Sequence, residues 1–147
     1  MTGRYPRGTA YHEAGHAVVA WSLGLQVGSI RLSDDDASGC TEIDGADRLL
    51  LVDQISVLSA GYAAERVFNC LAHEQAGLQD RAKILQLITS SGKSEKEQGR
   101  ALRDQGYERA SAHLIKHEGN VIRLAHHLIE HGSVDASGFL HLMAAAA

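Results

Sequence analysis

Residues 9–17 of the chain read TAYHEAGHA. They open a stretch that is rich in small residues, contains no proline and ends at Gly24, a residue type common just after a helix. Thr9 is a suitable N-cap, because its hydroxyl can accept a hydrogen bond from a backbone N–H of the first turn. The one proline of the chain, Pro6, precedes the stretch. We therefore predict a helix over residues 10–23.

Two histidines and a glutamate on this helix have the spacing of a zinc peptidase motif, His-Glu-x-x-His. Residues four apart on a helix are rotated by only about 40°, so His12 and His16 project from one face and can bind the same metal ion. Glu13 is displaced by about 100°, beside the metal, where it can take a proton from a water whose pKa Zn²⁺ lowers to about 7. We predict His12 and His16 as zinc ligands and Glu13 as the general base. The alternative is a chance match between two ordinary histidines.

A third protein ligand has to come from farther along the chain. A metzincin would place glycine and histidine at positions 19 and 22, which hold Val19 and Ser22, so that class is excluded. The remaining candidates are three acidic residues and one histidine: Glu65, Glu74, Asp80 and His73.

Asp80 is the most informative of these candidates. It opens a predicted helix on the same stripe as Ile84 and Ile88, where a buried carboxylate needs a cation or hydrogen-bond donors. A first-turn aspartate that interacts only with the helix dipole is the alternative. Glu65 is the next candidate, either as a metal ligand or as an acceptor from a zinc-bound histidine.

The composition limits the class of protein. The 147 residues suit one domain, residues 1–147, and 44 % hydrophobic with 22 % charged residues is a globular balance. A net charge of −4 argues against a nucleic-acid partner, because there is no basic excess to neutralise phosphates. No run reaches the roughly 18 apolar residues of a membrane span, and the N-terminus lacks the apolar core of a signal peptide. We expect a cytoplasmic protein without a membrane span.

The rest of the chain is predicted to be mainly helical. Residues 27–33 alternate and residues 40–43 follow a turn, which predicts two paired strands after the first helix. Apolar stripes and capping signals predict helices over residues 46–69, 79–89, 94–116 and 120–131, and from the Asp135 cap to the C-terminus. The expected fold is mainly α, a zincin-like helical domain with a small two-stranded β element after the zinc-binding helix.

Several segments, in the same order, resemble the peptidase domain of the FtsH family of AAA+ zinc metalloproteases. They are residues 9–17, 28–33, 39–43, 60–65 (AGYAAE), 107–110 and 124–130. The resemblance implies one zinc ion bound by two histidines and an aspartate, with Asp80 as the matching aspartate and Glu13 as the base. The ATPase module and membrane anchor of that family have no counterpart in this sequence. The domain is therefore expected to cleave flexible or unfolded polypeptides without ATP, or to depend on a separate ATPase or regulatory partner.

The first predicted strand is a candidate for substrate binding. An extended polypeptide could add to an exposed edge at Ser29, Ile30, Arg31 and Leu32, with backbone hydrogen bonds giving affinity and little sequence preference. An ordinary structural hairpin is the alternative.

Other patterns have more ordinary explanations. Residues 127–131 (HLIEH) fit an inverted zincin motif, and His113 and His117 lie one helical turn apart, but both are expected on solvated helix faces. Residues 34–39 resemble only the first half of a calcium-binding loop. Two non-enzymatic alternatives stay open: a catalytically silent, zinc-stabilised adaptor related to the protease domain, and a metal-free helical interaction domain.

Overall fold

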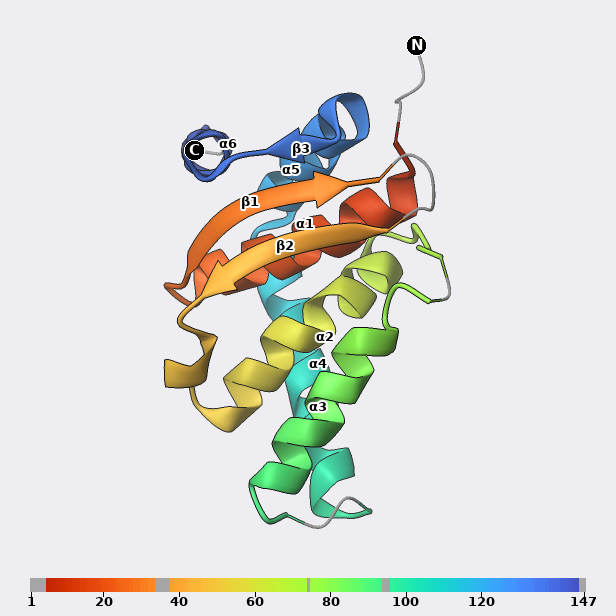
Figure 1. The fold of residues 1–147 in the computed structure, drawn as a ribbon, viewed down its shortest axis with the longest axis vertical. Helices are drawn as coiled ribbons and strands as arrows, with labels where there is room; N and C mark the ends of the chain where they lie inside the picture. The colour runs from red at the N-terminus through yellow and green to blue at the C-terminus, as the bar shows by residue number, and fades with distance from the viewer. Residues whose placement is uncertain (1–4, 34–37, 74, 94–95, 146–147) are drawn as a thin grey trace.

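The computed structural model describes residues 5–33, 38–73, 75–93 and 96–145. The elements are α1 (Arg7–Ser22), β1 (Gln26–Leu32), β2 (Gly39–Asp44), the 3-10 turn η1 (Ala46–Arg48), α2 (Leu51–Val67), α3 (Leu78–Ser90), α4 (Gln98–Lys116), α5 (Glu118–His131), β3 (Ser133–Val134) and α6 (Ala136–Ala144). Figure 1 shows β1 and β2 lying over α1 and roughly along it, with α2, α3 and α4 extending away from them. The prediction of a mainly helical fold with a small sheet is confirmed.

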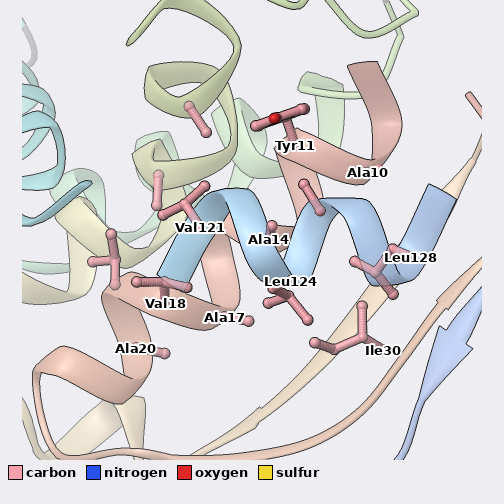
Figure 2. Packing of buried hydrophobic residues seen from close by; sticks show 14 of the residues in the cluster. Ala10, Tyr11, Ala14, Ala17, Val18, Ala20, Ile30, Val121, Leu124 and Leu128 are labelled. Atoms are coloured by element: carbon pink, nitrogen blue, oxygen red, sulfur yellow. The ribbon is translucent and has the colours of Figure 1, made fainter. Parts of the chain in front are cut away.

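Helix α1 lies in the interior of the fold. All its residues from 8 to 20 are buried. In Figure 2 its small and apolar side chains face Leu124 and Leu128 of α5 and Ile30 of β1. Residues as small as Ala14 and Ala17 let these neighbours approach closely at interior packing density. The His-Glu-x-x-His motif, residues 12–16, therefore lies in the interior of the protein and not on its surface.

The start of α1 differs from the prediction, whereas its end agrees. The helix begins at Arg7 after Pro6, whose φ of −62° suits a helix start and whose missing N–H leaves no donor unpaired. Thr9 lies inside the helix and is 1 % exposed, so its assignment as the N-cap is wrong. After the C-cap, Gly24 takes a left-handed conformation with φ of +84°, which glycine adopts without strain.

The sheet has three antiparallel strands in the order β2-β1-β3, one strand more than predicted. The two-residue strand β3 pairs with Ile30 and Arg31 of β1, and the N–H of Leu32 donates to the Gly132 carbonyl at 2.7 Å. Strand β1 is therefore the central strand, paired on its other side with β2. The expectation that residues 29–32 form an exposed edge is wrong, and β2 lies at the edge instead.

The other helices are close to their predicted positions. The segment predicted as one helix over residues 46–69 is divided, because Gly45 is left-handed and Leu49 and Leu50 are extended, so that α2 begins only at Leu51. The cap of α6 is confirmed: Asp135 Oδ1 accepts a hydrogen bond from the Gly138 N–H at 2.7 Å. The predicted capping residue of the helix over residues 94–116, Ser94, lies outside the described residues.

Candidate metal centre

Two helices bring His12, His16 and Asp80 together. The histidines lie one turn apart on α1, and Asp80 lies in the first turn of α3. The two Nε2 atoms are 3.1 Å apart, and Asp80 Oδ2 lies 3.2 Å from that of His12 and 3.0 Å from that of His16. His12 is 2 % exposed and the Asp80 side chain 19 %. The three side chains form a group that could hold a metal ion.

A hydrogen bond at Nδ1 holds each imidazole ring in its orientation, on the side of the ring away from Asp80. His12 Nδ1 lies 2.7 Å from Glu65 Oε2, and His16 Nδ1 lies 2.8 Å from the Val57 carbonyl oxygen. Carbonyl and carboxylate oxygens accept hydrogen bonds, so both Nδ1 atoms carry the proton. In the neutral rings, both Nε2 lone pairs then point into the space shared with Asp80.

This arrangement fits a zinc ion. Two imidazole lone pairs and a carboxylate oxygen converge without a donor among them, which is unfavourable unless a cation or a proton lies between them. Nitrogen and oxygen ligands from three side chains, with space for a water molecule, are typical of a catalytic zinc site. Glu65 lies on the Nδ1 side of His12 and also accepts the Ala72 N–H at 2.9 Å, so it is placed behind the ligand group rather than in it.

A glycine on α2 makes room for the ligand group. A Cβ atom at Gly61 would lie 2.5 Å from His12 Nε2 and 2.6 Å from His16 Nε2. One turn away along the same interface, a Cβ at Gly15 would lie 2.5 Å from the Ala60 carbonyl oxygen. Gly61 was not singled out from the sequence. The three alanines that accompany it in residues 60–64 (AGYAA) are the signal that could have indicated a close helix crossing.

The ligand group opens into a cavity of about 330 Å³. Glu13, 6 % exposed, lines this cavity together with the three candidate ligands. Its other walls come from β2, from apolar residues of α2 and from the α3 face that carries Lys83 and Leu87. The cavity therefore places a carboxylate outside the ligand group but beside it.

Without a metal ion, the carboxylates around these histidines favour a proton on the imidazole of His12. Burial disfavours the charged form of His12, but hydrogen bonds to Asp80 and Glu65 and the charges of Glu13 and Asp80 outweigh burial and raise its pKa to about 9. Burial also opposes the charged form of Asp80, yet hydrogen bonds to His12 and His16 hold the pKa of its carboxyl well below its usual range. The surroundings thus favour positive charge at this point.

The raised pKa of His12 predicts a pH dependence of the metal-free protein. A folded pKa of about 9 against an ordinary value of 6.5 gives a stabilisation that is complete below pH 6.5 and lost as the pH rises through 9. Thermal unfolding in excess chelator is expected to show a falling melting temperature across this window. Burial lowers the pKa values of His113, His117 and His127, so these histidines change the stability only below pH 6.5, outside the tested window. With zinc in place of the proton, the fall above pH 6.5 should largely disappear; a metal-free stability that stays constant from pH 6.5 to 9 contradicts the prediction.

The remaining sequence candidates lie elsewhere. His73 is exposed, and its Nδ1 accepts a hydrogen bond from the Gln75 N–H at 3.3 Å, whereas Glu74 lies outside the described residues. The rings of His127 and His131 are adjacent, with centroids 4.4 Å apart. Within the part of the chain that the structure describes, His12, His16 and Asp80 are the one group of three or more side chains able to hold a metal.

The comparison with known families identifies the class. The family model described as Peptidase M50B-like matches residues 8–89, more than half of the chain. This region includes the three candidate ligands and Glu13, and the chain belongs to the Peptidase M50B-like family. The match points to a metallopeptidase family but not specifically to FtsH. No curated protein matches the chain significantly. Among the described residues, no helix is both long and apolar enough to cross a lipid bilayer.

Proposed function

We propose that this chain is a zinc-dependent metalloendopeptidase in which His12, His16 and Asp80 bind one Zn²⁺ and Glu13 is the general base. The observation that carries the proposal is the convergence of three ligand atoms, 3.0 to 3.2 Å apart, in the cavity that Glu13 also lines. When bound, the zinc ion supplies a Lewis acid that lowers the pKa of a water molecule to about 7. Membership of the Peptidase M50B-like family supports the same reaction class.

Other residues of the chain would orient the metal ligands and transfer the proton. Glu65 and the Val57 carbonyl orient the rings of His12 and His16, which keeps both Nε2 atoms toward the metal position. Glu13 is the buried carboxylate that can accept a proton from the attacking water and then donate it to the leaving amine. Its place in the same cavity as the three candidate ligands supports this role.

We propose the outer edge of β2, in place of β1, as the substrate-binding strand. Gly39, Cys40 and Thr41 of β2 line the cavity, and β2 is an edge strand, whereas β1 is paired on both sides. An extended polypeptide added to this edge would run past the metal position and bind mainly through its backbone. Such binding requires a substrate without folded structure, which supports flexible or unfolded polypeptides as the substrate class.

Three finer features go beyond the family match. Cleavage without ATP by the isolated chain and assistance from a separate ATPase or regulatory partner rest on the resemblance to FtsH, whereas a cytoplasmic location is an expectation from the sequence pattern. They stay predictions.

The proposal is tested by metal analysis together with cleavage of an unfolded substrate such as casein. We expect one zinc per chain, loss of cleavage after chelation, and recovery when zinc is added back. Because zinc would bind the folded state and not the unfolded chain, chelation should also lower the melting temperature. A protein that holds no metal even after refolding with zinc would rule the proposal out.

A further inference from the structure

Strand β2 lies over α1, and two of its residues lie next to Glu13. Gly39 and Thr41 are two apart on the strand, so they face the same side. The Thr41 hydroxyl oxygen lies 2.6 Å from Glu13 Oε1 and 3.3 Å from the Glu13 carbonyl oxygen. A Cβ atom at Gly39 would lie 2.7 Å from Glu13 Cγ and 3.0 Å from Glu13 Oε2. The carboxylate is thus held at one oxygen, while the space beside the other is left open.

The hydroxyl of Thr41 has one proton, so it can donate only one strong hydrogen bond at a time. The carboxylate oxygen is both closer and more negative than the backbone carbonyl oxygen, so it takes that proton. Glu13 has a long side chain with several rotatable bonds, and holding one oxygen removes much of its freedom. The bond therefore selects the orientation in which Oε2 faces the open space.

We infer that Thr41 is a positioning residue for Glu13: it holds Oε1 so that Oε2 is available for the proton of the reaction, and Gly39 keeps that space clear. The inference rests on the proposed function, since it assigns the partner of the proposed base. It also links two tasks of β2, because the strand proposed to receive the polypeptide is the strand that orients the base. A misplacement of the base by about 1 Å can cost on the order of 100-fold in rate.

The test compares Thr41→Val with Thr41→Ser. Valine has nearly the shape of threonine and favours strands, so β2 should keep its conformation, but it has no donor. We expect Thr41→Val to lower kcat by roughly 10- to 100-fold with little change in KM and the same zinc content. Thr41→Ser should stay close to the wild type. In a Glu13→Gln background, Thr41→Val should lower the residual rate no further, because residues that act as a unit are not additive.

A second measurement does not depend on cleavage. A hydroxamate such as acetyl-leucine hydroxamate binds zinc and loses its hydroxyl proton, which a correctly oriented Glu13 would accept. Its affinity, measured by calorimetry at equal zinc content, should fall about tenfold in Thr41→Val and return in Thr41→Ser, the scale expected for one hydrogen bond to a charged group. If hydroxamate affinity changes in this way but the wild type cleaves no polypeptide, the role of Thr41 in orienting Glu13 is supported and the proposed hydrolysis is rejected. If the protein is active and Thr41→Val leaves kcat unchanged, the inference is overturned. It is also overturned if Thr41→Val leaves the hydroxamate affinity unchanged, whether or not the protein cleaves the substrate.

Discussion

Glu13→Gln is expected to reduce cleavage of an unfolded polypeptide by about 10²- to 10⁴-fold, the usual contribution of a general base, while one zinc per chain stays bound. Glutamine has nearly the same shape as glutamate, and its carbonyl oxygen can still accept the hydrogen bond from Thr41. It cannot take a proton from water. Since His12, His16 and Asp80 supply the ligand atoms, metal content should not change. The measurement is kcat with casein, together with zinc analysis of the same sample.

The matched control is Glu108→Gln, which makes the same chemical change at an exposed position of α4. It should leave both cleavage and zinc content unchanged. A Glu13→Gln protein that binds zinc and cleaves as fast as the wild type contradicts the assignment of the base. A wild type that binds zinc and unfolded chains but never cleaves them would instead favour the adaptor.

The part of the site that could be predicted from sequence is the part that depends on local geometry. The positions of His12, Glu13 and His16 on one helix follow from helical spacing, and the structure places all three in the interior on α1. Asp80 belongs to a different helix, so spacing could not place it. Two other signals favoured it: a carboxylate on an apolar stripe, and the resemblance to a known peptidase segment. The structure brings it to within 3.2 Å of both histidines.

The errors concern contacts that no local pattern determines. Residues 26–32 alternate as a strand should, but whether a strand is central or at an edge depends on its partners. Here the deciding partner is β3, two residues long and about 100 residues later in the chain, and a segment that short has no periodicity to detect. Thr41 and Gly61 were missed for a related reason, since each acts through a side chain on another element.

The small residues between α1 and α2 connect the fold to the site. Gly15 lets the two helices approach, and Gly61 leaves room where the approach is closest to the ligand atoms. A zinc site at this point would therefore depend on the helix crossing as well as on the ligands themselves. This dependence leads to a prediction that separates packing from metal binding.

Gly61→Ala is expected to abolish zinc binding at micromolar metal concentration. Its Cβ would lie 2.5 to 2.6 Å from both Nε2 atoms, closer than two unbonded atoms can approach. The rings cannot turn aside easily, because each is buried and fixed through Nδ1 by Glu65 or the Val57 carbonyl. Either the imidazoles leave the ligand geometry or α2 moves away from α1, and both remove the site. Zinc content and the rise in melting temperature on adding zinc to the metal-free protein measure the effect.

Two other glycine variants serve as controls for this prediction. Gly119→Ala introduces the same methyl group into α5, where no atom lies within 4 Å, so it should retain zinc and gain up to about 1 kcal/mol from helix propensity. Gly15→Ala forces a Cβ against Ala60 and Ala64 in the same helix crossing, which should cost about 1–3 kcal/mol without touching the ligand nitrogens. If Gly15→Ala keeps the zinc-dependent rise in melting temperature and Gly61→Ala loses it, the effect of Gly61 is on the metal position itself. Equal loss in both variants would mean that helix packing alone controls the site, and wild-type zinc affinity in Gly61→Ala would show that the metal does not bind between these two histidines.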